Sequence, residues 1–273
     1  TILSQYGLFH SMSKLAPEDK FIDFSDYGRP IAKLIALALK NTKATPIHVT
    51  LAFGLSGLLA IYCIFQEYYW AAGFFLILKS ILDAADGELS RQKNTPSYVG
   101  RYLDSIFDII LNFLLLFSIG FLSHSPIWIT FLAFVCVQLQ GTLYNYYYVI
   151  LRNISIGGDS TSKVFEQKAP TAFSGENQKT VNVMFLIFNV LYGFFDRFIQ
   201  MLDTNAHRSK NYPNWFMSFV SVYGLGFQLL LVSVFLILGY LHFILPFFVG
   251  YTILLPIMIT IRKALNQYLK KYS

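Results

Sequence analysis

Long apolar runs recur along this chain, and they restrict its fold more than any other feature of the sequence. Five of them contain no charged residue other than Asp104 and Asp108, and they lie at about residues 47–65, 102–122, 126–150, 215–239 and 243–261. About 20 apolar residues are enough for a helix to cross the hydrocarbon core of a bilayer. Because backbone groups in lipid must bond within the protein, such runs predict helices packed together in one bundle.

Two further apolar segments, 69–90 and 181–203, carry charges, and the placement of basic residues decides how they are interpreted. If 181–203 does not cross the membrane, the 21 lysines and arginines all fall on the N-terminal side, apart from Lys79 within a span. If it crosses, the basic C-terminus lies outside. The positive-inside rule therefore predicts an all-α integral membrane protein with six transmembrane helices and both termini in the cytosol. Segment 181–203 is then an extra helix on the cytosolic face.

The N-terminal part of the chain differs from the rest. We expect residues 1–45 to form a cytosolic segment and residues 46–273 to form the transmembrane domain. Within the first, the stretch 29–40 opens with Arg-Pro and places Ile31 and Leu34 on one helical face with its lysines elsewhere. This pattern predicts an amphipathic helix on an anionic membrane surface, the alternative being an ordinary core helix.

Composition excludes several classes of protein. With 55% hydrophobic and only 13% charged residues, the chain does not resemble a soluble domain of its length. The net charge of +6 does not indicate nucleic-acid binding, because the basic residues flank apolar spans. Cys63 and Cys136 both lie in apolar runs and are expected to be buried hydrophobes. The first twenty residues lack the pattern of a signal peptide.

The most unusual stretch reads D-x2-D-G-x2-S-R-x8-G-x3-D-x3-D and begins at Asp83. Asp83 and Asp86 are three residues apart, and Asp104 and Asp108 four apart, so each pair shares a helical face. The short polar loop 92–99 makes the two helices antiparallel neighbours. Four carboxylates are thus expected to meet at the cytosolic ends of two membrane helices, where ionised groups are costly and usually functional.

Oxygen ligands of this kind suit Mg²⁺ or Mn²⁺, and two ions are typical of phosphoryl chemistry. Gly87 and Gly100, each one turn from an aspartate, leave room for a ligand or a neighbouring helix. Arg91 offers a guanidinium to a diphosphate. The alternative is a polar network that only packs helices. Lys79, one turn before Asp83, is equally well explained as the ion-pair partner of that residue or as a substrate contact.

The stretch resembles the signature of CDP-alcohol phosphotransferases, integral membrane enzymes of phospholipid synthesis, which reads D-x2-D-G-x2-A-R-x8-G-x3-D-x3-D. Ser90 replaces the usual alanine, and the other positions match with full spacing: Asp83, Asp86, Gly87, Arg91, Gly100, Asp104 and Asp108. The resemblance implies transfer of a phospho-alcohol from a CDP-linked donor to an acceptor hydroxyl, with release of CMP. It also implies six spans and a homodimer.

The resemblance assigns roles residue by residue. Asp83, Asp86 and Asp104 would bind metal, and Asp108 would bind the second metal and act as general base. The contacts to the CDP moiety would come from Gly87, Arg91, Gly100 and Thr50. The family pattern P-N-x-x-T before the first span is only partly kept, because Pro46 and Thr50 are present but Ile47 stands at the asparagine position. His48 is either a substitute for that asparagine or a structural residue.

Other functions and substrates stay open. Membrane prenyltransferases also use aspartate-rich motifs, but on distant helices, and an ion-coupled transporter would place polar groups in several spans. Within the family we favour CDP-diacylglycerol and a small polar alcohol, the alternative being CDP-choline or CDP-ethanolamine with diacylglycerol. Gly54 and Gly57 form a small-residue face on the first span that is too weak a signal to assign a dimer interface.

Three other stretches are ambiguous. The tyrosine-rich run 144–148 is typical of an interfacial aromatic belt, the alternative being a substrate wall. The run 157–162 favours turns over a phosphate-binding nest. Within 181–203, polar residues recur every seven positions and form a stripe on one helical face: Asn182, Asn189, Asp196 and Asp203.

Overall fold

The computed structural model describes residues 15–156, 166–209 and 212–272, and the phosphate-nest candidate 157–162 lies outside them. Helices account for the regular structure of the described residues, which contain no strand. The α-helices are α2 (Arg29–Leu39), α3 (Pro46–Phe65), α4 (Tyr69–Lys93), α5 (Tyr98–Leu122), α6 (Ile127–Ile156), α7 (Gln178–Leu202), α8 (Asn214–Val220), α9 (Leu225–Ile237), α10 (Ile244–Tyr251) and α11 (Leu254–Tyr272).

The number of candidate membrane spans confirms the predicted fold class. Five helical stretches are long and apolar enough to cross a bilayer: α3, α5, α6, α7 and the run 241–267. The pair α8 and α9, bent by 52° at its break, passes as a sixth. α4 is 25 residues long, and it is absent from this set because Lys79 and the acidic residues that follow it make the helix too highly charged.

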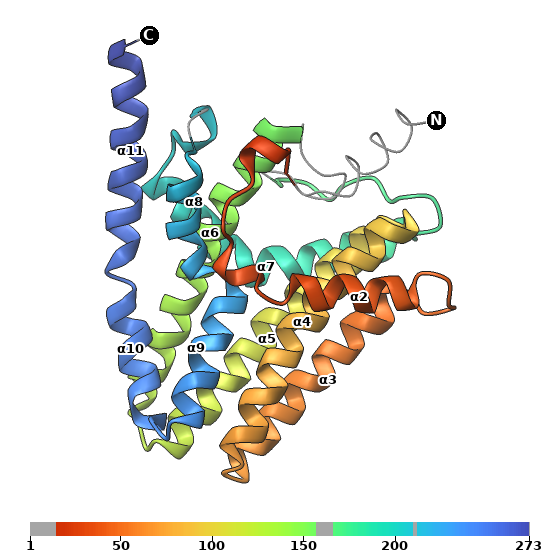
Figure 1. Ribbon diagram of the computed structural model, residues 1–273, viewed down its shortest axis with the longest axis vertical. Helices are drawn as coiled ribbons and strands as arrows, with labels where there is room; N and C mark the ends of the chain where they lie inside the picture. The colour runs from red at the N-terminus through yellow and green to blue at the C-terminus, as the bar shows by residue number, and fades with distance from the viewer. Residues whose placement is uncertain (1–14, 157–165, 210–211, 273) are drawn as a thin grey trace.

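Figure 1 shows that α3, α4, α5 and α9 run along the bundle, whereas α2 and α7 lie across it. α2 packs against α4, and α7 packs against α5 and α6. The three loops without lysine or arginine, 66–68, 123–126 and 238–240, lie at the lower end of the view, opposite the end of α11. The crosswise position of α7 agrees with a helix on the cytosolic face. By length and composition alone, α7 also qualifies as a membrane span.

The first span begins with a capping box. Thr45 and His48 bond reciprocally, with the His48 ring nitrogen Nδ1 accepting from the Thr45 backbone N–H at 3.0 Å. Pro46 follows as the first helical residue, where its missing N–H costs nothing. His48 therefore has a structural role at this helix start. The sequence had left open whether it is structural or replaces the asparagine of the family pattern.

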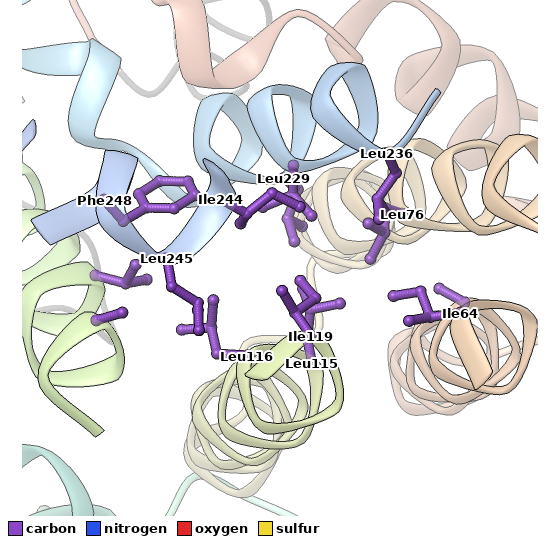
Figure 2. Packing of buried hydrophobic residues seen from close by; sticks show 14 of the residues in the cluster. Ile64, Leu76, Leu115, Leu116, Ile119, Leu229, Leu236, Ile244, Leu245 and Phe248 are labelled. Carbon is purple, nitrogen blue, oxygen red and sulfur yellow. The ribbon is translucent and has the colours of Figure 1, made fainter. Parts of the chain in front are cut away.

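The core lies between the spans, away from the acidic stretch. Figure 2 shows apolar side chains of α3, α4, α5, α9 and α10 converging on one centre. The labelled members of this cluster are Ile64, Leu76, Leu115, Leu116, Ile119, Leu229, Leu236, Ile244, Leu245 and Phe248. Since lipid is as apolar as these side chains, close packing holds such helices together more than removal from water does.

Two glycines of α3 set its distance from α5. A Cβ on Gly54 would lie 2.9 Å from the Phe107 ring, and a Cβ on Gly57 would lie 2.8 Å from the Leu111 side chain. The small-residue face of the first span is therefore filled within the chain by α5. α3 also packs against α4, so it bridges the two helices that carry the aspartates.

Candidate active site

A cavity of about 750 Å³ lies between α4, α5, α6, α7 and the N-terminal segment. All four aspartates of the acidic stretch line it, as does Gly87. The cavity wall does not include Thr50, Arg91 or Gly100, the other three residues expected to contact CDP. The acidic stretch thus forms one wall of a hollow large enough for a small ligand.

Three of the four carboxylates gather closely. One oxygen from each of Asp83, Asp104 and Asp108 lies within 4.8 Å of the other two. Oδ1 of Asp104 is buried and finds no hydrogen-bond partner among the described residues. Like charges this close, with one acceptor left unsatisfied, fit a divalent cation with oxygen ligands such as Mg²⁺ or Mn²⁺.

The fourth aspartate stands apart from this group. Asp86 is buried, and its Oδ2 accepts a hydrogen bond of 2.6 Å from the Thr50 hydroxyl on α3. The resemblance implied that Asp86 binds metal together with the other three aspartates and that Thr50 contacts CDP. The structure brings Thr50 to Asp86, so that this threonine orients one carboxylate of the cavity wall.

Lys79 is buried beneath the cluster, with 1% of its side chain exposed. Its ammonium donates to Oδ1 of Asp108 at 2.6 Å and lies 4.9 Å from the centre of the Phe53 ring. The sequence left open an ion pair with Asp83 or a substrate contact, and the structure instead pairs Lys79 with an aspartate of α5. A permanent positive charge offsets part of the negative charge of the cluster.

Two arginines share one glutamate at the edge of this site. Arg91 Nη2 donates to Oε2 of Glu88 at 2.8 Å, and Arg29 Nη1 donates to the same oxygen at 3.2 Å. Arg29 also pairs with Asp26, and it lines the cavity, which Arg91 does not. Sequence reasoning treated Arg29 only as a helix-start residue. Nothing in the sequence around Arg29, which precedes a proline, indicated that its side chain lines a cavity.

The two glycines of the motif differ in their surroundings. A Cβ on Gly87 would meet only the Arg91 guanidinium, at 3.6 Å, so this glycine leaves the cavity wall open. Gly100 instead donates its backbone N–H to the Ser97 hydroxyl at 2.8 Å, which caps α5. The structure thus brings Gly87 to the site and places Gly100 at a helix start.

Residues 15–28, which we call the strap, run over the cavity before α2 begins. The Tyr144 hydroxyl donates to Oδ2 of Asp23 at 2.6 Å, and the Phe24 N–H donates to the Ser221 hydroxyl at 2.9 Å. Ser25 packs directly on Gly224 and Gly226, where any larger residue would collide with it. The strap is therefore seated between α6 and the start of α9.

The tyrosine-rich run lines the cavity, so the aromatic-belt interpretation is wrong for it. Tyr144, Tyr146 and Tyr148 all belong to the wall, and Tyr147 is fully buried beside them. These residues lie in the C-terminal half of α6. The alternative that the sequence left open, a substrate wall, matches their position.

Three of the four residues of the polar stripe of α7 face inward, whereas Asn182, near the start of the helix, is exposed. Asn189 and Asp196 line the cavity, while Asp203 at the helix end is buried in an ion pair with Arg262 of α11. The Tyr147 hydroxyl donates to the same aspartate at 2.7 Å. From Asn189 onward, the seven-residue repeat therefore marks the side of α7 that closes the cavity and joins the C-terminal helix.

One carboxylate outside the membrane fixes the start of α5. Glu176 accepts from the Ser97 hydroxyl at 2.7 Å and from the Val99 N–H at 2.9 Å. Burial would raise the pKa of Glu176, but these donors outweigh it and lower the pKa below its usual 4.5. The loop before α7 is thereby tied to the helix that carries Asp104 and Asp108.

A family model described as CDP-alcohol phosphatidyltransferase matches residues 43–207, more than half of the chain. The matched range contains the whole acidic motif and helices α3 to α7, and it leaves out the strap, α2 and helices α8 to α11. No curated protein matches the chain in a sequence comparison.

Proposed function

The chain belongs to the CDP-alcohol phosphatidyltransferase family of phosphate-group transferases, and we propose that it moves a phosphatidyl group from CDP-diacylglycerol to a small polar alcohol. The observation that carries this proposal is the group formed by Asp83, Asp104 and Asp108 in a cavity wall. Four acids and an arginine at family spacing support the same reaction. The cavity supplies room for a donor head group beside them.

In this proposal the aspartates hold two Mg²⁺ or Mn²⁺ ions. Asp83, Asp104 and Asp108 would supply oxygens directly, and Asp86 is held by a hydrogen bond from Thr50. The ions would neutralise the donor diphosphate and the leaving CMP. Gly87 lets the diphosphate approach α4, and Arg29 and Arg91, both held by Glu88, supply positive charge at that end.

Asp108 is the proposed general base. Lys79 occupies its Oδ1, so Oδ2 is the oxygen that would accept the proton of the acceptor hydroxyl. The acceptor oxygen then forms a bond to the phosphorus that carries the diacylglycerol. The bond from that phosphorus to the CMP oxygen breaks, and CMP leaves with the electron pair.

We further propose a homodimer whose active site faces the cytosol. The cytosolic orientation rests on the loops at one end of the bundle, which contain no lysine or arginine. Cross-linking in native membranes followed by mass determination tests the dimer, and a monomeric product at every cross-linker length would refute it.

The decisive experiment supplies radiolabelled CDP-diacylglycerol to the purified protein with a panel of alcohols and follows CMP and the lipid product. We expect Mg²⁺- or Mn²⁺-dependent release of CMP, abolished by Asp108→Asn. Glu18→Gln, an acid-to-amide change at an exposed residue, is the matched control and should leave the rate unchanged.

Two outcomes would redirect the assignment. Release of CMP only from CDP-choline or CDP-ethanolamine, with diacylglycerol as acceptor, would replace the proposed substrates by those of the other branch. No release from any donor, together with ion transport that Asp108→Asn alters, would replace the transferase by a transporter.

A further inference from the structure

Three uncharged amides line the cavity below the aspartates. Asn112 is four residues after Asp108 on α5, and therefore one turn deeper on the same helical face. Gln138 of α6 and Gln228 of α9 also line the cavity. Gln228 bonds the carbonyl of Val137, the neighbour of Gln138, and lines a small adjoining hollow together with Asn112 and Leu225. All three amides are buried, with 7%, 5% and 3% of the residue exposed.

The hydrogen bonds of these amides are incomplete. Nε2 of Gln138 is buried and has no hydrogen-bond partner among the described residues. Gln228 Nε2 is used, because it donates to Gln140 Oε1 at 3.0 Å and to the Val137 carbonyl at 3.2 Å. Leaving a buried amide without a hydrogen bond costs free energy. A ligand that enters the cavity and bonds to the Gln138 amide would remove this cost.

The cavity end that the three amides line offers no free charge to bind a charged ligand. The arginines of the α5 and α6 walls, Arg101 and Arg152, lie 11 residues before Asn112 and 14 residues after Gln138. At 1.5 Å per residue, these separations are about 16 Å and about 21 Å along the helices. The α5 and α6 walls therefore carry no basic side chain at the amide-lined end. The other two arginines of the cavity, Arg29 and Arg197, belong to α2 and α7, and Lys79 is neutralised by its pairing with Asp108.

We propose that the amide-lined end, made by Asn112, Gln138 and Gln228, binds the acceptor, and that the acceptor is an uncharged alcohol with several hydroxyl groups. This inference rests on the proposed function. An amide offers both a donor and an acceptor, which matches a hydroxyl in either role. A polyol bound here places one hydroxyl at Asp108, one turn above, and its other hydroxyls on the amides.

The test compares acceptors in the CDP-diacylglycerol assay: myo-inositol and glycerol as neutral polyols, glycerol 3-phosphate as an anion and L-serine as a zwitterion. We expect a neutral polyol to give the highest kcat/KM. Gln138→Met and Asn112→Leu should each raise the KM for that polyol about 2- to 12-fold, as expected for one lost hydrogen bond. The KM for CDP-diacylglycerol should not change in either variant.

A matched control and a separate binding measurement make the result interpretable. Gln66→Met makes the same change at an exposed loop residue and should leave every acceptor KM unchanged. Mn²⁺-dependent binding of CDP, measured by calorimetry, reports on the donor site alone and shows that each variant is folded. Variants that retain CDP binding but lose polyol affinity support the inference.

Two results would overturn it. If CMP is released with glycerol 3-phosphate or L-serine but with neither polyol, the acceptor inference fails and the proposed function stands. The same holds if Gln138→Met and Asn112→Leu leave the polyol KM unchanged. If the wild-type protein neither binds CDP nor releases CMP with any acceptor, the proposed function fails and the inference falls with it.

Discussion

The buried pair between Lys79 and Asp108 gives a sharp quantitative prediction for Lys79→Met. The ammonium and carboxylate are 2.6 Å apart, and the lysine is 1% and the aspartate 15% exposed. At an effective dielectric constant of about 20, Coulomb attraction at that distance is about 6 kcal/mol, from which desolvation of both ions must be subtracted. Removing one partner of a buried pair usually destabilises a protein by about 3–5 kcal/mol, because the other charge stays uncompensated.

The assay is equilibrium chemical unfolding of the purified protein in detergent with EDTA present. We expect Lys79→Met to lower the free energy of unfolding by about 3–5 kcal/mol. The double variant Lys79→Met/Asp108→Asn should recover part of this loss, because it removes the uncompensated carboxylate. Added Mg²⁺ should narrow the difference between wild type and Lys79→Met, since a cation at the cluster supplies the missing charge.

Lys40→Met, at an exposed position after α2, is the matched control and should have almost no effect. The reasoning is refuted if Lys79→Met is as stable as this control. It is also refuted if the double variant is no more stable than Lys79→Met, because the cost would then not come from the charge of Asp108.

Three further predictions concern the surroundings of the cavity. Arg29→Met should raise the KM for the CDP-linked donor by about 10- to 100-fold, as for a lost charge-assisted hydrogen bond, and an unchanged donor KM would exclude it from the donor site. Glu176→Gln should reduce stability at neutral pH. Since the folded-state pKa of Glu176 is lowered from 4.5, the difference from wild type should shrink as pH falls below that value, and a gap that persists in acid would contradict this origin. Cysteines at Gln178 and Thr204, at the two ends of α7, should both react with an impermeant thiol reagent from the same side of the membrane; labelling from opposite sides would show that α7 spans.

Features that depend on neighbouring residues in the sequence could be predicted well. The first span was expected at 47–65 and is Pro46–Phe65, and the second was expected at 69–90 and is Tyr69–Lys93. Apolar run length and the prolines before spans carry this information, because a helix in lipid satisfies its own backbone. The approach of the carboxylates was also predictable, because their spacing puts each pair on one helical face and the short loop 92–99 makes the two helices neighbours.

Contacts between helices could not be read from spacing. Asp83 was one of two partners that the sequence left open for Lys79, the other being a substrate, whereas the partner lies on α5. The single span expected at 215–239 is bent by 52° between α8 and α9, at Gly224. That glycine and Gly226 admit Ser25 of the strap, a residue about 200 positions earlier in the chain.

The cavity wall also depends on groups whose sequence signal was weak. Tyrosines near a span end are typical of an interfacial belt, and only the packing of α6 against its neighbours turns these inward. Asn112 had a signal that could have been used, because it continues the four-residue spacing of Asp104 and Asp108 by one more turn. A polar residue in the middle of an apolar run is a functional candidate even when it is uncharged.

The chemistry of the cavity changes with depth, and the cost of burial explains the order. Carboxylates are tolerable where Lys79 offsets their charge, where Thr50 donates a hydrogen bond and where the proposed metal ions would bind. Arginines lie where α5 begins and α6 ends. Farther into the bundle an unpaired charge would be much more costly than an unpaired amide, so hydrogen-bonding capacity is supplied there by neutral groups. A cavity built in this way favours a substrate whose phosphates stay beside the aspartates and whose deep-lying part is polar but uncharged. Because Asn112 and Gln138 lie deep in the bundle, the part of the acceptor that reaches them should be uncharged.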